Sequence, residues 1–216
     1  MYRTRIKICG IKEREHAQAA VDAGADYIGL VFVEKSPRFV TLEQADAVVS
    51  AMPNHVDAVG LFVDHDPQEI KGIAEQLGLS VVQLHGHEEP SALDELSGLR
   101  VWKALPFTQD LNDRAEAWDQ APRLEALLID TPPQGELTGG SGVAFEWAAL
   151  AEIKDQLSKP IILAGGLTPA NVHEAIEIVR PYAVDVSSGV ESSRGVKDPG
   201  LIWCFSDSVT LANHSQ

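Results

Sequence analysis

The sequence predicts an α/β fold, a single (β/α)8 TIM barrel with eight parallel strands over residues 1–216. Short apolar segments alternate with segments of helical composition along the chain, as in a parallel sheet. At 216 residues the chain is long enough for one buried core of this kind. A doubly wound open sheet would show the same alternation. The positions of Cys9, Arg38, His85, Asp130, Gly165-Gly166 and Ser187-Ser188 favour the barrel. Each lies at or just beyond the carboxyl end of a predicted strand, and in a barrel these ends meet on one face.

Eight β-prone segments supply the predicted strands. They occupy residues 3–8, 27–32, 58–63, 81–84, 101–105, 127–129, 161–164 and 183–186. The segment at 161–164 is wholly apolar, which indicates a buried strand.

The segments between these strands predict eight helices, several with recognisable ends. Thr41 is a predicted N-cap, and Asp66-Pro67 begins a helix that ends at Gly78. Asp198-Pro199 begins the last helix in the same way. The expected helices cover residues 13–23, 41–50, 66–78, 89–97, 109–118 and 145–157, a segment capped by Thr168-Pro169, and residues 198–211.

Two turns, after the seventh and eighth predicted strands, have the composition of an anion site. Gly165 and Gly166 remove the side chains after residue 164, which leaves backbone N–H groups accessible. Ser187, Ser188 and Gly189 open the connection after residue 186. Barrels of this type commonly bind phosphate with the loops after strands seven and eight. We therefore expect these five residues to bind a phosphate group.

Composition limits the classes of partner. The formal net charge of -15 disfavours attraction to nucleic acid or anionic lipid, so an anionic ligand needs local donors. No basic N-terminus precedes an apolar segment and no segment approaches the length of a membrane span, which predicts a cytoplasmic protein. Cys9 and Cys204 are too few for a disulfide scaffold and match no zinc pattern, so we expect free thiols and no metal.

Cys9 and Asp130 are the candidates for acid–base chemistry. Cys9 ends the first strand opposite the anion site, with Gly10 beside it, and nearby N–H dipoles would favour a thiolate able to take a proton from carbon. Its alternative role is packing. Asp130 ends the sixth strand before a long loop, and partial burial would raise its pKa and let it donate a proton. Its alternative role is a loop cap. Base and acid on opposed strands are the minimum equipment for an isomerisation.

Other residues are candidates for ligand contacts. The planar fork of Arg38 suits a ligand carboxylate, with a solvated surface charge as the alternative. His85 is a possible substrate contact, although a structural role is favoured. Asp185 is expected to orient backbone donors or a ribose. Gly139-Gly140-Ser141-Gly142, after Asp130, predicts a flexible lid, with a plain linker as the alternative. Cys204 is expected to fill core space in the last helix.

Several motifs together identify a family resemblance. They are Lys7-Ile8-Cys9-Gly10-Ile11, Ser36-Pro37-Arg38-Phe39-Val40, Val82-Gln83-Leu84-His85-Gly86, Asp130 with Gly139-Gly140-Ser141-Gly142, residues 164–172 and residues 184–191. With them the chain strongly resembles the phosphoribosylanthranilate isomerase family of tryptophan biosynthesis, from the first strand past the eighth. The glycine pair occurs in many phosphate-binding barrels, whereas the motifs around Cys9, His85 and Asp185 are far more specific in combination.

The resemblance implies an Amadori rearrangement of N-(5-phosphoribosyl)anthranilate to 1-(2-carboxyphenylamino)-1-deoxyribulose 5-phosphate, without a metal or organic cofactor. Asp130 would protonate the furanose ring oxygen, and Cys9 would remove the C2′ proton. Arg38 would hold the anthranilate carboxylate. Phosphate would be held by backbone amides around Gly165, Gly166, Ser188 and Gly189. The implied partner is a small phosphoribosyl substrate, with no nucleic acid or membrane, and the implied assembly is a monomer or a homodimer.

Two positions depart from the family pattern, and two alternative functions stay open. Val143-Ala144 follow the glycines where relatives commonly continue with a lysine, and Phe39 replaces a common tyrosine, so those two contacts are not carried over. The first alternative is another phosphate-binding barrel enzyme of ribotide or indole metabolism, which would call for a catalytic lysine or a pair of carboxylates at strand ends; Lys103 is the only nearby candidate for the lysine. The second is a phosphosugar-binding or thiol-sensing protein without turnover, whose Cys9 would respond to oxidation.

Overall fold

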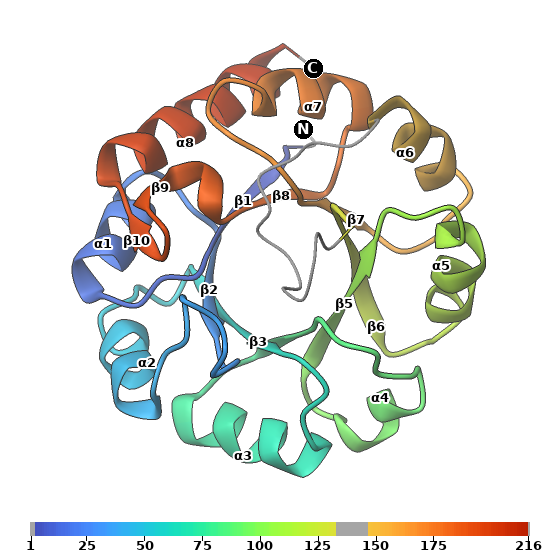
Figure 1. Ribbon diagram of the computed structural model, residues 1–216, viewed down its shortest axis with the longest axis horizontal. Coiled ribbons are helices and arrows are strands. Elements are labelled where there is room, and N and C mark those ends of the chain that lie inside the picture. The colour runs from blue at the N-terminus through green and yellow to red at the C-terminus, as the bar shows by residue number, and fades with distance from the viewer. Residues whose placement is uncertain (1–2, 133–146, 216) are drawn as a thin grey trace.

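The strands of the chain close into a barrel (Figure 1). The structure is a computed structural model that describes residues 3–132 and 147–215. Neighbouring barrel strands are parallel and follow sequence order, and β1 pairs with both β2 and β8, which confirms the barrel and excludes the open sheet. The strands are β1 (Arg5–Cys9), β2 (Tyr27–Val31), β3 (Asp57–Phe62), β4 (Val81–Leu84), β5 (Arg100–Pro106), β6 (Leu124–Asp130), β7 (Ile161–Leu163) and β8 (Ala183–Val186).

Helices surround the ring of strands (Figure 1). They are α1 (Arg14–Asp22), α2 (Leu42–Val49), α3 (Pro67–Leu77), α4 (Ala92–Glu95), α5 (Leu111–Asp119), α6 (Trp147–Lys154), α7 (Val172–Val179) and α8 (Pro199–His214). Thr41 forms a capping box with Gln44, and Asp66 and Asp198 cap α3 and α8, each followed by proline. None of the described helices is long and apolar enough to cross a membrane.

Two predicted helices differ from the observed ones. The helix expected at 89–97 shrinks to α4, because the Glu88 carboxylate accepts the N–H groups of Asp64 and Gly86 and holds the preceding segment as a loop. The helix expected from Thr168-Pro169 begins only at Val172. Thr168 is not its cap, because the Asn171 side chain accepts the Thr168 N–H and closes a separate turn first.

The connection after β8 contains elements that the sequence did not predict. A 3-10 helix, η1 (Ser188–Val190), is followed by two short antiparallel strands, β9 (Glu191–Ser193) and β10 (Val196–Lys197). Gly195 joins them with a φ of 80°, and a Cβ there would lie 2.6 Å from the Pro37 carbonyl oxygen. This β9–β10 hairpin therefore packs against the loop after β2.

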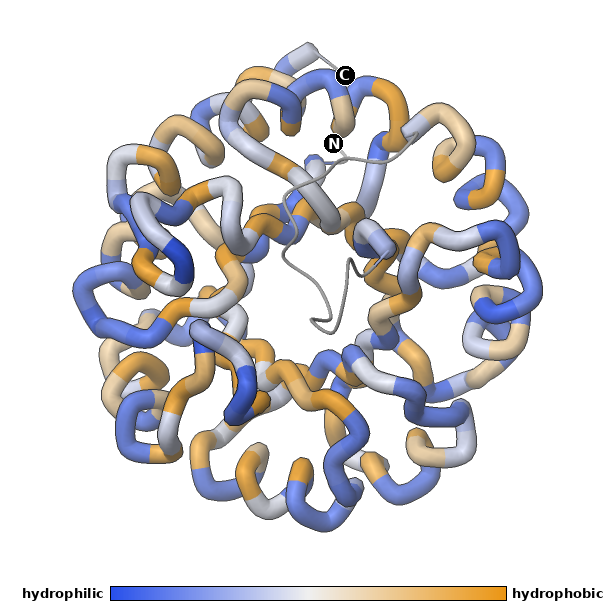
Figure 2. The backbone as a smooth tube through the Cα atoms, in the orientation of Figure 1, coloured by the Kyte–Doolittle hydropathy of each residue, from blue (hydrophilic) through white to orange (hydrophobic). Residues whose placement is uncertain are grey.

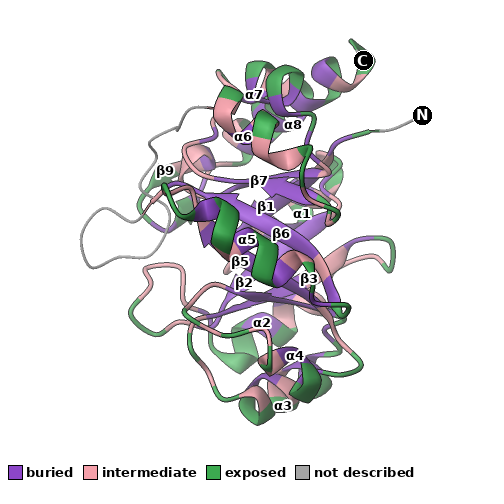
Figure 3. Cartoon of the chain, turned by 90° about the vertical axis from the view of Figure 1, so that its right-hand side faces the viewer, coloured by how far each residue is buried: buried purple, intermediate pink, exposed green. Residues whose placement is uncertain are grey.

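The core has two layers. One lies between the strands and the helices, and Figure 2 shows hydrophobic segments on the barrel with hydrophilic ones along the outer helices. Figure 3 shows the strands buried and the outer helix faces exposed. The second layer fills the barrel from alternate strand positions: Tyr27, Val59, Val81, Trp102, Ala104, Ala126, Leu128, Ile162, Ala164 and Ala183. Following this alternation to the carboxyl ends of the strands identifies the side chains that face the barrel mouth.

Candidate active site

Cys9 and Asp130 both continue the inward-facing alternation at the carboxyl end of the barrel. Cys9 pairs with Gly29, two residues beyond the pairing of Lys7 with the interior residue Tyr27. Asp130 lies two residues beyond the interior residue Leu128 on β6. The two side chains therefore face the axis from β1 and β6 at the same end of the barrel.

The space around the Cys9 thiol is set by Gly29 on the neighbouring strand. A Cβ on Gly29 would lie 2.8 Å from the Cys9 sulfur, which is too close for an ordinary contact. Gly10, which follows Cys9 in the chain, accommodates Arg38 instead: a Cβ on Gly10 would lie 2.6 Å from the Arg38 Cδ. Two glycines thus let the thiol and the arginine stem approach the end of β1.

Two charged residues lie beneath Cys9 inside the barrel. Lys7 Nζ donates to Asp185 Oδ1 at 2.8 Å, and the Lys7 side chain is 0% exposed. Burial raises the pKa of the Cys9 thiol and outweighs Lys7, which acts in the opposite direction. The net shift is therefore opposite in direction to the one expected from nearby N–H dipoles. Asp185 binds a buried lysine, which the sequence reasoning did not foresee.

Asp130 is held at the end of β6 by its neighbours. It is 8% exposed, and its Oδ1 accepts the Thr131 backbone N–H at 2.7 Å. His85 follows β4, with Nε2 3.5 Å from Asp130 Oδ2 and Nδ1 2.8 Å from the Gln83 side-chain nitrogen. His85 therefore lies between a buried amide and the carboxylate, in contact with the candidate acid.

The glycine turn after β7 lies beside Asp130. Gly165 and Gly166 have φ values of 79° and 66°, a conformation that favours glycine. A Cβ on Gly165 would overlap Thr131 and lie 3.0 Å from Asp130 Oδ1. Asn171 Nδ2 donates to the Gly166 carbonyl oxygen at 2.9 Å and fixes the turn. The turn is thus close-packed against the end of β6.

The turn after β8 packs against the turn after β7. A Cβ on Gly189 would overlap the Leu167 carbonyl oxygen. Ser187 Oγ donates to the Cys9 carbonyl oxygen at 3.2 Å, which ties this turn to β1. Within the described parts of the chain, no hydrogen bond engages the backbone N–H groups of Gly165, Gly166, Ser188 and Gly189. These amides are available to an anion.

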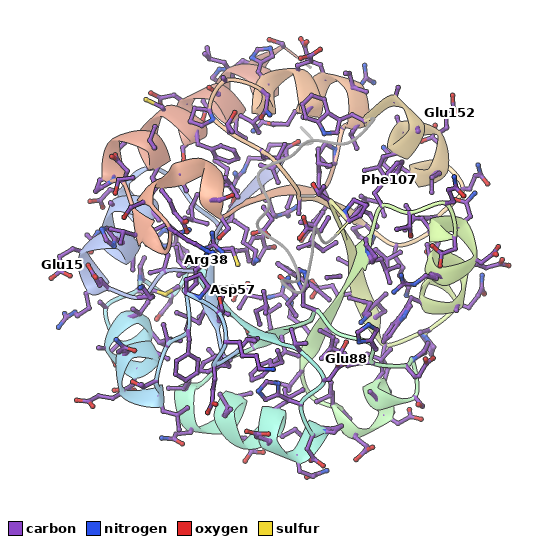
Figure 4. The ribbon with its side chains drawn as sticks, viewed as in Figure 1. Glu15, Arg38, Asp57, Glu88, Phe107 and Glu152 are labelled. Atoms are coloured by element: carbon purple, nitrogen blue, oxygen red, sulfur yellow. The ribbon has the colours of Figure 1, made fainter. Side chains whose placement is uncertain are left out.

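Arg38 follows β2 and already holds a protein carboxylate. Its Nε and Nη2 donate to the two carboxylate oxygens of Glu191 at 2.7 and 2.9 Å. Figure 4 shows Arg38 at the edge of the barrel mouth beside β1 and β2. Its expected role with a ligand carboxylate is therefore limited to the donors that Glu191 leaves unused.

A cavity of about 650 Å³ opens beside Asp130, between the β4–α4 loop, the end of β5 and α5. Its lining includes His85, Asp130, Lys103 and Arg114. Cys9 is not among its described lining residues. The candidate acid thus borders a space large enough for a small ligand.

Two further expectations concern residues outside this group. Lys103 lies between the interior positions Trp102 and Ala104, so it points away from the axis, and its Nζ binds Glu88 Oε2 at 2.6 Å. This orientation weakens the alternative in which Lys103 is a catalytic lysine. Cys204 is exposed on α8, so its expected core role is wrong. Both cysteines are free thiols.

The predicted lid, Gly139-Gly140-Ser141-Gly142, lies outside the described residues. Among residues 3–132 and 147–215, no group of three or more potential ligand side chains could hold a metal ion.

Comparison with known proteins decides the family. A family model described as N-(5'phosphoribosyl)anthranilate (PRA) isomerase matches residues 6–208. The chain belongs to this family. The match confirms the resemblance found in the sequence motifs and agrees with a barrel that places Cys9 and Asp130 at its mouth.

Individual members of the isomerase family are similar over nearly the whole chain. An N-(5'-phosphoribosyl)anthranilate isomerase of Pseudomonas fluorescens Pf-5 is 47% identical, over 98% of this chain and 98% of that protein. The solved isomerase of Thermus thermophilus is 33% identical with a TM-score of 0.84, covering 96% of this chain and 99% of that one. A further isomerase structure, in complex with reduced 1-(o-carboxyphenylamino)-1-deoxyribulose 5-phosphate, is 34% identical with a TM-score of 0.82 and covers 96% and 98%.

Proposed function

We propose that the chain converts N-(5-phosphoribosyl)anthranilate to 1-(2-carboxyphenylamino)-1-deoxyribulose 5-phosphate by an Amadori rearrangement, as one domain over residues 1–216 and without a cofactor. The supporting observation is that Cys9 and Asp130 face the axis at the barrel end that carries the unbonded amides of the β7 and β8 turns. Family membership and the ligand bound to a related isomerase point to the same chemistry.

Asp130 is the proposed acid. Protonation of the furanose ring oxygen breaks its bond to C1′, while the nitrogen lone pair forms the C1′=N double bond of a Schiff base. The carboxyl group is buried and anchored through Oδ1 by Thr131, which leaves Oδ2 to face His85 and the cavity. His85 contacts the acid and is proposed to orient it.

Cys9 is the proposed base. In the Schiff base the C2′–H bond is acidified, and transfer of this proton to the thiolate leaves an enolamine. Loss of the O2′ proton and protonation at C1′ give the ketone. The enzyme then carries one more proton on Cys9 and one fewer on Asp130, and exchange with solvent restores both. Because burial raises the pKa of Cys9, the cation of Lys7 is needed to support the thiolate.

The two anionic ends of the substrate require separate sites. Phosphate is proposed to bind the amides of Gly165, Gly166, Ser188 and Gly189, with Ser187 anchoring the second turn through the Cys9 carbonyl. The anthranilate carboxylate is proposed to bind Arg38. Backbone donors suit an acidic chain, since they bind a dianion without adding side-chain charge. The reaction needs only a small phosphoribosyl substrate and no residue from a second subunit.

The test is turnover of phosphoribosylanthranilate generated in situ, followed by the loss of its fluorescence. We expect Cys9→Ala and Asp130→Asn each to lower kcat at least about a hundredfold while a reduced product analogue still binds. Cys204→Ala is the matched control, because it removes an exposed thiol on α8 and should leave kcat unchanged. Full activity in Cys9→Ala would reject the base. A wild type that binds the analogue but never converts the substrate would instead support the sensor alternative.

A further inference from the structure

The β9–β10 hairpin presents Glu191 to Arg38. Glu191 is the first residue of β9, and its side chain is 4% exposed. Arg38 engages both carboxylate oxygens in a bidentate pair, which fixes the plane of the guanidinium as well as its position. Among the described residues, none accepts a hydrogen bond from Arg38 Nη1. One edge of a largely buried cation is therefore left for another acceptor.

The remaining capacity of Glu191 is filled by the hairpin itself. Lys197 Nζ donates to Glu191 Oε1 at 2.8 Å, and the Gly195 N–H donates to Oε2 at 3.0 Å. The Lys197 side chain is 1% exposed, and its Nζ also donates to the Ser187 carbonyl oxygen at 2.9 Å. The carboxylate thus cannot turn away from Arg38 without breaking several charge-assisted bonds.

The charges in this cluster do not cancel. Burial lowers the pKa of the Lys197 ammonium group, and Glu191 acts in the opposite direction. With Lys197 protonated, Glu191 is one anion between two cations, Arg38 and Lys197, so the group carries a net positive charge in a largely water-excluded position. Burial acts to raise the pKa of Glu191, but Arg38 and then Lys197 overcome it and lower the pKa to about 2, so the anion is ionised at neutral pH. Arg38 keeps its Nη1 edge unused in this cluster. An anionic ligand group bound there would accept from Nη1 and offset the surplus positive charge.

We propose that Glu191 is a positioning residue that holds Arg38 with its Nη1 edge toward the carboxylate of the anthranilate ring. This inference rests on the proposed function. Glu191 does not touch the substrate. It acts by fixing the guanidinium before binding, so that less conformational freedom of Arg38 is lost when the carboxylate arrives. Lys197 and Gly195 in turn hold Glu191, which gives the β9–β10 hairpin a role in selecting substrates that carry the carboxylate.

A purely structural ion pair makes a different prediction. If the pair only fastened the hairpin to the β2 loop, removing Glu191 would weaken binding of every ligand to a similar extent, or would lower stability alone. The distinguishing measurement is therefore the ratio of two affinities. The probes are two reduced product analogues, one with the ring carboxylate and one with an unsubstituted phenyl ring, titrated by calorimetry.

For Glu191→Gln we expect the Kd of the carboxylate analogue to rise about tenfold, while the Kd of the phenyl analogue changes less than about twofold. We define the ratio as the Kd of the phenyl analogue divided by the Kd of the carboxylate analogue, so that it falls when preference for the carboxylate is lost. Glu191→Asp should restore part of the wild-type ratio. Glu125→Gln is the matched control: Glu125 forms a comparable bidentate pair with Arg100 at the other end of the barrel, so the ratio should keep its wild-type value. Lys197→Gln, which leaves the Arg38–Glu191 pair in place, should lower the ratio in the same direction as Glu191→Gln.

Equal losses for the two analogues, or no loss for either, would overturn the proposal. If Glu191→Gln fails to fold, the Lys197→Gln titration decides in its place, and an unchanged ratio there overturns the proposal as well. Turnover of phosphoribosylanthranilate by the wild type is measured alongside. A wild type that discriminates between the analogues but does not turn over substrate refutes the proposed function, whereas turnover without discrimination refutes the role of Glu191.

Discussion

Replacing Gly29 with alanine should move the Cys9 thiol without touching any ligand. The new Cβ would lie 2.8 Å from the sulfur and 2.9 Å from the Cys9 Cα, against 3.4–4 Å for an ordinary contact. The thiol must therefore shift by roughly 0.6 Å. Misplacement of a reacting group by about 1 Å can cost about a hundredfold in rate, so we expect kcat to fall about tenfold. Overpacking should also lower stability by about 1–3 kcal/mol.

The matched control is Gly60→Ala on β3. Its Cβ would lie 2.8 Å from Phe62 and 3.0 Å from Leu79, an overlap of the same size on the outer side of the barrel. Thermal unfolding should show similar losses for both variants, about 2–4 °C for each kcal/mol. Fluorescence kinetics should show a lower kcat for Gly29→Ala alone. Equal kcat values at equal stability would refute the claim that the position of this thiol matters.

Three further results are expected. Lys7→Met removes the cation that lowers the pKa of Cys9. The rise of kcat/KM with increasing pH should therefore occur at higher pH than in the wild type, and an unchanged pH profile would contradict the role of Lys7. Gly165→Ala should raise the KM about tenfold, because the added Cβ overlaps Thr131 in the glycine turn. Gly78 is the control: it has a similar positive φ, and a Cβ there meets no atom within 4 Å. Gly78→Ala should therefore lower only the stability, by about 1–2 kcal/mol in thermal unfolding. Thr41→Ala should cost about 1 kcal/mol in the same assay and leave kcat/KM unchanged, since it removes only the cap of α2.

The barrel could be predicted because its signals are local. Each strand is a short apolar segment, and caps such as Thr41 and Asp66 lie within three residues of the helices that they begin. Parallel strands with crossover helices bring every carboxyl end to one face, so the sequence predicts that Cys9 and Asp130 lie at the same end of the barrel. The prediction that Thr168 caps α7 was wrong, because a residue with N-cap chemistry can equally well precede a turn that another side chain closes.

The charged partners could not be predicted because they meet only in the folded barrel. Lys7 and Asp185 are 178 residues apart in sequence, and Arg38 and Glu191 are 153 apart. One signal was present: Lys7 has the same strand parity as Cys9 and so had to face the interior, where a lysine needs a counter-ion. No comparable pattern marked Lys197, since the β9–β10 hairpin is too short to show periodicity.

In the proposed mechanism, Cys9 and Asp130 act on one sugar whose phosphate is bound by main-chain amides. A crystal structure with reduced 1-(o-carboxyphenylamino)-1-deoxyribulose 5-phosphate tests it most directly. We expect the Cys9 sulfur within about 3.5 Å of C2′, the Asp130 carboxyl at a similar distance from the oxygen derived from the ring, and the phosphate on the Gly165 and Ser188 amides. A ligand bound in the cavity beside Asp130, with Cys9 out of reach, would rule out the paired action of these two residues.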